Sequence, residues 1–247
     1  METTVAIILA GGSKPLITIG KRYMVDFVVE ALQKLPYLQR IIIAGSPEAL
    51  KKKYAEQSPQ IELVNSGETT IESFMQAFRL VPEDAQQILI ATGDIPLLTP
   101  EAVNHFVESC RKLEGALFYP IVSKEVNEQK YPGVKRTYVH LREGVFTGGN
   151  LFLIKPQIVE QCVEEAKELV RLRKKPLALV SHLGWKLLWN YVWGRLSLKE
   201  AEKGVSRLLG GVNGVAVISP YPEIGVDVDK PSDLALAKEI LTDISKK

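Results

Sequence analysis

Short apolar runs alternate with helical patterns along the first half of this chain, and that alternation limits the folds open to it. The apolar runs are typical of buried strands, and they cover residues 5–10, 41–44, 61–64 and 87–91. Apolar residues at helical spacing predict helices between and after these strands, at residues 24–35, 47–56, 71–80 and 99–113. Elements in this order form a largely parallel sheet with helices on both faces. The sequence therefore predicts an α/β fold.

The second half of the chain departs from this regular order. Further strands, which make the predicted sheet mixed, are expected at residues 116–122, 134–141, 145–154, 214–219 and 224–228. Pro120 should lie at the edge or end of its strand because proline lacks an N–H group. Residues 156–210 read as almost wholly helical, in about three segments, and residues 232–244 as a final helix. We expect one domain over residues 1–247, with a helical insertion at about 156–210.

Two features of the predicted insertion invite an interpretation. Trp185, Trp189 and Trp193 recur every four residues and therefore share one face of a helix. We expect this face to pack against the sheet, with a dimer interface or a ligand cavity as the alternatives. The basic run at residues 171–175 is expected to form a solvated helix end.

Composition narrows the class of protein. The net charge of +2 and the charged content of 24% are ordinary for a globular chain, so neither nucleic acid nor a membrane is expected as the main partner. The first residues lack the basic start of a signal peptide, and no apolar run approaches the ~18 residues of a membrane helix. Cys110 and Cys162 have no metal-ligand spacing and are expected to be buried thiols in a reducing compartment. We expect a cytoplasmic protein; its oligomeric state stays open, with a homodimer as one alternative.

Asp94 is the first candidate for a chemical role. It follows the apolar run at 87–91, within Gly93-Asp94-Ile95-Pro96, and so should lie at the carboxyl end of a central strand. Open α/β sheets bind their ligands at this edge. A carboxylate there suits Mg²⁺, which takes oxygen ligands and commonly bridges to phosphates. A role limited to capping the turn is the alternative.

A second acidic group lies near the end of the chain. Asp227 and Asp229 are two residues apart at the end of a predicted strand and so share one face. If this strand end meets that of Asp94, carboxylates would converge and repel one another without a cation, which favours a bound metal. Asp233, in the first turn of the last helix, is better explained as a partner of the helix dipole.

The loop after the first strand has the composition of a phosphate-binding turn. Gly11 and Gly12 allow a ligand to approach the backbone, whose N–H groups can face phosphate oxygens. Lys14 adds a cation for the same phosphates. The loop is neither a Walker motif nor a dinucleotide fingerprint, since both glycine patterns are absent. A tight turn that happens to carry Lys14 is the alternative.

Three motifs together resemble one family. Leu9-Ala10-Gly11-Gly12, Gly93-Asp94-Ile95-Pro96-Leu97 and Asp229-Lys230-Pro231-Ser232-Asp233-Leu234 occur in the order and spacing of MobA-like NTP transferases. These are nucleotidyltransferases with a GT-A-like, Rossmann-type fold, also called the nucleotide-diphospho-sugar transferase fold. The resemblance covers residues 5–155 and 214–245. It implies that Asp94 and Asp229 hold a metal, Mg²⁺, and that Lys14 takes part in catalysis.

The resemblance also implies a division of the site. The nucleotide side would include Leu9, Ala10, Gly11, Gly12, Lys14, Gly45, Gly67, Thr70 and Gly93. The acceptor side would be the loop Gly148-Gly149-Asn150, in which the asparagine amide suits a hydroxylated acceptor. Thr70 could equally be an ordinary helix cap, and the glycine pair an ordinary β-bulge.

The chain departs from the family in its first loop, which is shortened and has no match for the arginine that cradles the triphosphate. We expect another arginine to converge on the site, with Arg22 as the first choice and Arg136 as the second. The predicted protein is a Mg²⁺-dependent nucleotidyltransferase that transfers an NMP group from an NTP to a small phosphorylated or hydroxylated acceptor and releases pyrophosphate. The alternatives are a nucleotide-sugar glycosyltransferase, whose usual Asp-x-Asp signature is absent, and a non-catalytic nucleotide-binding regulator, which the shortened loop favours.

Overall fold

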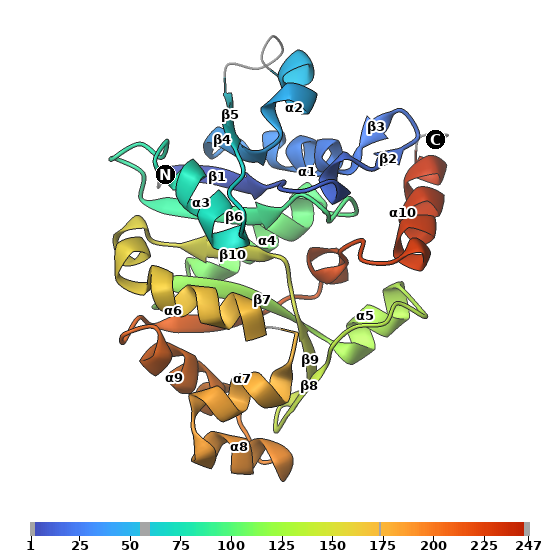
Figure 1. Ribbon diagram of the computed structural model, residues 1–247. Coiled ribbons are helices and arrows are strands. Elements are labelled where there is room, and N and C mark those ends of the chain that lie inside the picture. Colours follow the sequence, from blue (N-terminus) through green and yellow to red (C-terminus); the bar gives the residue numbers. More distant parts are fainter. Residues whose placement is uncertain (1–2, 55–59, 173, 245–247) are drawn as a thin grey trace.

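The computed structural model describes residues 3–54, 60–172 and 174–244. Within these ranges the main sheet has nine strands, eight of them in the order β5-β4-β1-β6-β10-β7-β9-β8, and β11 pairs with β7. Helices cover both faces of the sheet (Figure 1). The predicted α/β fold with a mixed, mostly parallel sheet is therefore confirmed. The predicted helix end at residue 56 lies outside the described residues.

The first half of the chain builds the parallel part of the sheet around a central strand, β1. The parallel strands are β1 (Thr4–Leu9), β4 (Leu38–Gly45), β5 (Ile61–Asn65) and β6 (Gln87–Thr92). The helices that follow them are α1 (Met24–Gln33), α2 (Pro47–Tyr54), α3 (Thr70–Phe78) and α4 (Pro100–Cys110). Because the strands are parallel, their carboxyl ends all lie at one edge of the sheet, where the loops after β1, β4, β5 and β6 gather.

The two faces of β1 show why these residues form a buried strand. Ala6 and Ile8 belong to the core that includes α1 and α4. Val5 and Ile7 point the other way, into the core that includes α3 and α6 (Val159–Leu172). A strand that is covered on both sides needs apolar residues at every position, which explains the unbroken apolar run in the sequence.

The second half of the chain extends the sheet with antiparallel pairs. Its strands are β7 (Leu117–Ser123), β8 (Val139–Leu141), β9 (Gly144–Gly148), β10 (Leu151–Ile154) and β11 (Gly214–Ile218). The predicted strand at 134–141 is therefore limited to its last three residues, and the one at 145–154 is divided at Gly149 and Asn150. Further elements that the sequence did not predict are α5 (Lys124–Lys130) and a small hairpin of β2 (Thr18–Ile19) and β3 (Arg22–Tyr23).

Pro120 is not at an edge, and that prediction was wrong. β7 has neighbours on both sides, with β11 on one and β10 and β9 on the other. On the second side β7 pairs with β10 up to Phe118 and with β9 from Ile121 onward, so Pro120 lies where the partner changes. Its carbonyl accepts the Gly149 N–H at 2.8 Å. The missing N–H of proline faces this break in the ladder, where no strand bond is needed.

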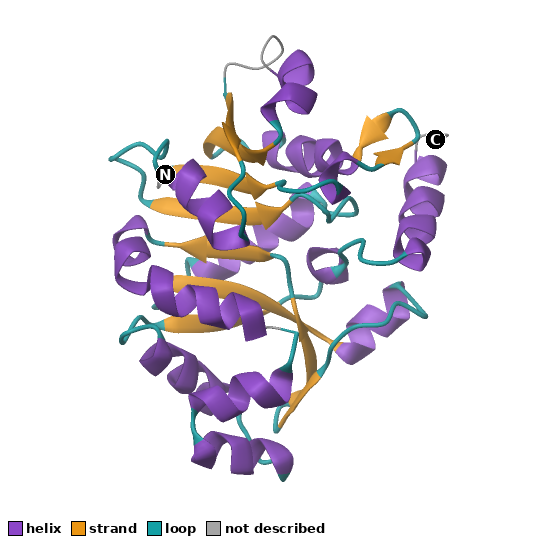
Figure 2. Cartoon of the chain, viewed as in Figure 1, coloured by secondary structure: helices purple, strands orange, loops and turns teal. Residues whose placement is uncertain are grey.

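The segment from 156 to 210 is helical, as predicted, but its described residues, 156–172 and 174–210, form four α-helices instead of about three. They are α6, α7 (Pro176–Leu183), α8 (Trp185–Val192) and α9 (Leu198–Leu208), preceded by a short 3-10 helix, η2 (Pro156–Ile158). Figure 2 shows α6 on a face of the sheet and the other three gathered at one end of the molecule. None of the helices in the described ranges is long and apolar enough to cross a membrane.

Two further predictions in this half were wrong. Residues 224–228 do not form a strand: a 3-10 helix, η3 (Pro222–Gly225), leads into an irregular segment before α10 (Pro231–Ile244). The three tryptophans do not pack against the sheet, because all three side chains are exposed. α8 instead packs through Leu187, Leu188 and Tyr191. Periodicity correctly placed the tryptophans on one face, but the opposite face is the one that the fold covers.

Candidate functional site

Three carboxylates converge at the carboxyl edge of the sheet. Asp94 follows β6, while Asp227 and Asp229 lie in the segment between η3 and α10. Each offers an oxygen, and these oxygens all lie within 4.8 Å of one another. The backbone holds this approach, because the Val228 N–H donates to the Asp94 carbonyl at 2.9 Å. The predicted meeting of Asp94 with Asp229 is confirmed, and Asp227 lies within the same cluster.

Gly93 positions Asp94 by permitting close contact with the first loop. Its N–H donates to the Leu9 carbonyl at 2.9 Å. A Cβ added at Gly93 would lie 3.1 Å from the Cβ atoms of both Ala10 and Pro15. The sharp turn after β6 therefore needs glycine, since any side chain would press on the loop that carries Lys14.

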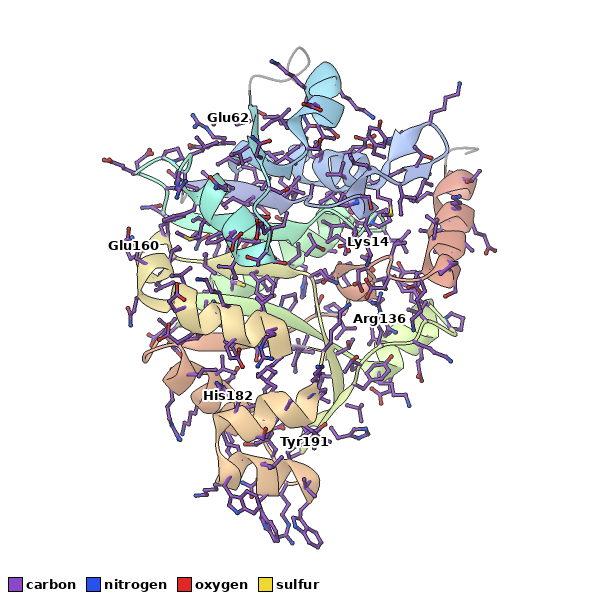
Figure 3. The ribbon with its side chains drawn as sticks, in the orientation of Figure 1. Lys14, Glu62, Arg136, Glu160, His182 and Tyr191 are labelled. Carbon is purple, nitrogen blue, oxygen red and sulfur yellow. The ribbon has the colours of Figure 1, made fainter. Side chains whose placement is uncertain are left out.

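Three cations surround the acidic cluster. Lys14 and Lys174 both form ion pairs with Asp229, and Arg136 forms an ion pair with Asp227 in which each side chain is only 9% exposed. Figure 3 shows Lys14 and Arg136 at the side of the sheet that faces α10. Asp94, by contrast, makes no ion pair with any residue that the structure describes. It is the carboxylate of the cluster with most to gain from an added cation.

The pKa values reflect this arrangement. Burial raises the pKa of the Asp94 carboxyl above its ordinary value, and the nearby charges of Asp227 and Asp229 raise it further. Partial burial would also raise the pKa of Asp229, but its ion pairs with Lys14 and Lys174 hold it well below the ordinary value. The hydrogen bond to Asp229 raises the pKa of Lys14, so this lysine stays charged.

The first loop presents free backbone donors beside the cluster. Gly11, Gly12, Ser13 and Lys14 are all exposed, and Gly12 has a φ of 74°, which favours glycine. No hydrogen bond within the described ranges uses the N–H groups of Gly11, Gly12 and Ser13. Consecutive free N–H groups next to a lysine form a concave binding surface for anions such as phosphate.

The glycines predicted on the nucleotide side mainly serve close packing. A Cβ at Gly45 would lie 3.1 Å from the Ala10 carbonyl oxygen, and one at Gly67 would lie 2.3 Å from the Glu72 Cβ. Both therefore hold the loops after β4 and β5 close to their neighbours. Thr70 begins α3, but the cap is Thr69, whose hydroxyl accepts the Glu72 N–H at 3.1 Å. The cap alternative for Thr70 was wrong.

The loop predicted for the acceptor lies between β9 and β10. The Asn150 N–H donates to the Ile224 carbonyl at 2.9 Å, so η3 fixes this loop. A Cβ at Gly149 would lie 2.6 Å from the Ile224 side chain, whereas one at Gly148 would meet nothing within 4 Å. The Asn150 side chain is nearly buried and lines a cleft without a hydrogen bond to any described residue. Its amide is therefore available to a ligand.

That cleft has a volume of about 580 Å³ and joins the predicted acceptor loop to the acidic cluster. Its polar part includes Asn150, Arg136, Asp227, Asp229 and Lys174. Its apolar part is formed by side chains of β8, β9 and α7 and of the segment that follows α8, among them Leu141, Phe146, Leu179, Val180 and Leu196. The helical segment thus forms one wall of the cleft, although its tryptophans do not.

The structure decides between the two expected arginines. Arg22, the first choice, forms its ion pair with Glu30 at 2.6 Å and stacks on Phe27, so it pairs with no carboxylate of the cluster. Arg136, the second choice, is in the cluster, and its buried Nε atom has no hydrogen-bond partner. Sequence reasoning missed Lys174, because it belongs to a basic run that resembles any solvated helix end.

Asp233 has the structural role that its position predicts. Its carboxylate accepts the N–H groups of Asp229 at 3.2 Å and Lys230 at 3.0 Å, at the start of α10. This capping fixes the backbone that carries Asp229.

The acidic cluster fits a divalent cation. Octahedral Mg²⁺ with ligands at 2.0–2.1 Å places neighbouring oxygens about 3 Å apart and opposite oxygens about 4 Å apart. The three carboxylate oxygens lie within 4.8 Å of one another, which is close to that spacing. Asp94 is half-buried and forms no ion pair with any described residue, so it has no cation partner in this structure. Asp94 and Asp229, with Asp227 beside them, are the residues that could hold such a metal.

Comparison with known proteins adds to this geometry. Residues 6–183 match the family model of the MobA-like NTP transferase domain, while no curated protein matches the sequence. A solved structure of a hypothetical transferase from Thermus thermophilus is 39% identical, with a TM-score of 0.78, over 95% of this chain and 100% of that one.

Two more distant structures share the fold. The 4-diphosphocytidyl-2C-methyl-D-erythritol synthase from Anaerococcus prevotii is 14% identical, with a TM-score of 0.66, over 98% of this chain and 99% of that one. The 2-C-methyl-D-erythritol 4-phosphate cytidylyltransferase from Thermus thermophilus is 15% identical, with a TM-score of 0.59, over 98% of this chain and 100% of that one.

Proposed function

Because the chain belongs to the MobA-like NTP transferase family and is a nucleotidyltransferase, we propose that it transfers an NMP group from an NTP to a small phosphorylated or hydroxylated acceptor. Mg²⁺, held by Asp94 and Asp229, is part of this proposal, and pyrophosphate is the second product. The observation that carries it is the convergence of three carboxylates beside a loop with free N–H groups and beside the cleft that Asn150 lines.

The reaction can be written from this placement. An acceptor oxygen attacks the α-phosphorus of the NTP and forms a new P–O bond, while the bond from that phosphorus to the bridging oxygen of the β-phosphate breaks. A metal on the carboxylates would neutralise charge on the phosphate oxygens. The N–H groups of Gly11 to Ser13 and the Lys14 ammonium bind the phosphates, and Asn150 orients the acceptor. Catalysis of this kind depends on positioning and charge stabilisation.

The cations of the site would change partners during binding. Lys14 and Lys174 pair with Asp229 in this structure, and both side chains are about half exposed. The phosphates of a bound nucleotide would offer both lysines a new anion, and Asp229 would then be free to hold a metal, which would supply the compensating positive charge. Arg136 is buried against Asp227 and stays paired with it, and its buried Nε donor has no hydrogen-bond partner among the described residues.

An assay of pyrophosphate release, with each NTP and a mixed acceptor pool, tests the proposal. Turnover with one NTP is expected, and Lys14→Met should lower kcat/KM by about 10–100-fold, the usual range for a lost charge-assisted hydrogen bond. Lys21→Met is the matched control, because Lys21 is exposed and lies in the turn of the β2–β3 hairpin. Tight binding of a nucleotide without turnover of any NTP would contradict the proposal and leave the non-catalytic regulator as the explanation.

A further inference from the structure

The helices α7 and α8 carry a concentrated apolar surface on the outside of the molecule. Seven large apolar side chains are exposed within the described ranges, and five of them lie here. They are Leu177, Trp185 (76% exposed), Trp189 (54%), Val192 and Trp193 (60%); we call this set the tryptophan face. All three tryptophans of the chain belong to it. Figure 3 shows side chains of α8 that project away from the body at the bottom of the view.

The tryptophan face is separate from the side of α8 that packs against the rest of the protein. α8 already has a buried face, in which Leu187, Leu188 and Tyr191 pack with Val180 and Leu196. The tryptophans lie on the opposite side, and the rings of Trp189 and Trp193 contact each other with centroids 5.7 Å apart. A contiguous exposed patch of large apolar side chains marks an interaction surface.

The surroundings of this face are strongly basic. Residues 169–199 contain seven lysines and arginines and no aspartate or glutamate. Since the whole chain has a net charge of +2, the remaining residues sum to −5. Lys175, Lys186, Arg195 and Lys199 are exposed and form no ion pair with any described residue. The mild overall charge, from which we did not expect a membrane as partner, conceals this local concentration.

We propose that the tryptophan face docks on the surface of an anionic lipid bilayer. Tryptophan favours the boundary between headgroups and acyl chains, where its apolar ring and its N–H group are both satisfied. Lysine and arginine near that boundary are attracted to anionic headgroups, each contributing about a fivefold increase in binding. A second copy of this chain fits less well, because a two-fold contact through this face would bring two basic surfaces together.

The tryptophan face lies next to the cleft, so docking through this face would also position the cleft. α7 contributes Leu177 to the face and Pro176, Leu179 and Val180 to the lining of the cleft. A docked molecule would therefore hold the cleft close to the headgroups. The proposal does not depend on the reaction, since no residue of the face belongs to the acidic cluster.

Tryptophan fluorescence tests the proposal directly, because every tryptophan of the chain is in the face. The full chain is titrated with vesicles of phosphatidylcholine and phosphatidylglycerol, and with vesicles of phosphatidylcholine alone. We expect a shift of emission to shorter wavelength and quenching by brominated acyl chains with the anionic vesicles, weakened by added salt. Lys186→Glu with Arg195→Glu should weaken vesicle binding by at least 25-fold, at about fivefold for each cation lost.

Matched variants separate the face from general surface effects. Lys112→Glu with Lys238→Glu changes the charge equally at exposed positions elsewhere and should leave vesicle binding within about twofold of the wild type. Trp189→Ser with Trp193→Ser should abolish co-sedimentation with vesicles, whereas Leu113→Ser with Ile218→Ser, at the other two exposed apolar positions, should not. Failure of anionic vesicles to shift the emission would overturn the proposal. So would a shift that appears without lipid as the protein dimerises, or an equal shift with single-stranded oligonucleotides.

Discussion

Replacing Asp94 with asparagine should separate the charge of this residue from its shape. Its carboxylate lies within 4.8 Å of those of Asp227 and Asp229. At that distance each like-charge pair costs about 1 kcal/mol in water and about 3.5 kcal/mol at an effective dielectric constant of 20. Asp227 and Asp229 have cation partners, but Asp94 has none among the described residues. Without metal, Asp94→Asn should therefore leave the free energy of unfolding equal or higher.

The direction of this change in the free energy of unfolding follows from the pKa of Asp94. Because burial and the two carboxylates raise it in the folded state, folding favours the neutral form, and the stability gained from that form is lost as pH rises through the raised pKa. Asparagine stays neutral and avoids this loss. At about 2–4 °C for each kcal/mol in a chain of this size, the melting temperature should be unchanged or up to about 10 °C higher.

With metal and nucleotide the effect should reverse. A divalent cation about 2.1 Å from a carboxylate oxygen gains about 4 kcal/mol even at the dielectric constant of water. An amide oxygen recovers part of this, so affinity for the Mg²⁺-nucleotide complex should fall by about 100-fold or more. Isothermal calorimetry measures the affinity, and thermal unfolding with EDTA or with Mg²⁺ measures the stabilities.

Asp84→Asn is the matched control, since Asp84 is exposed and forms no ion pair in the described ranges. Equal Mg²⁺-nucleotide affinity in Asp94→Asn and Asp84→Asn would refute the metal assignment. A lower melting temperature of Asp94→Asn in EDTA would refute the charge argument and show that Asp94 mainly stabilises its turn.

Three further outcomes follow from the site and the core. Arg136→Met should cost about 3–5 kcal/mol in urea unfolding because it leaves Asp227 buried without its cation; adding Asp227→Asn should restore most of this, and additive losses would contradict the pairing. Asn150→Ala should raise the KM for the acceptor by about 3–10-fold in the pyrophosphate assay, and an equal rise for the NTP would remove Asn150 from the acceptor side. Burial raises the pKa of Cys110 to about 12, so iodoacetamide should label this thiol only after unfolding, as measured by mass spectrometry. Rapid labelling of the native protein would show that the core around Cys110 is open.

The sequence was sufficient for the features that depend on local pattern. The apolar run at residues 5–10 predicted a buried strand, and the structure has β1 there. Parallel order then placed Asp94 at the carboxyl edge of the sheet, where it lies. Asp229 could be assigned to the same site because its motif matched a family in which the two acidic residues occur together.

Local sequence pattern was insufficient where the same residues were compatible with two different structures. Pro120 looked like an edge residue because it lacks an N–H, yet β7 is interior and changes partner at that point. Residues 224–228 are apolar enough for a strand, but they are buried in an irregular segment instead. In both cases the deciding contact comes from a distant part of the chain, which a window of neighbouring residues cannot show.

The sequence by itself determined the order of strands and helices along the chain, the apolar faces of the helices and the acidic residues of the site. Each of these can be read from the spacing of residues within a short stretch of the chain. Only the tertiary structure decided which cations meet those acids. Lys14 and Lys174 reach Asp229 across 215 and 55 residues of sequence, and Arg136 reaches Asp227 across 91. The tertiary structure also leaves the tryptophans of α8 exposed to solvent. The sequence pattern shows that one face of a helix is apolar, but only the packing of the other elements decides whether that face is covered.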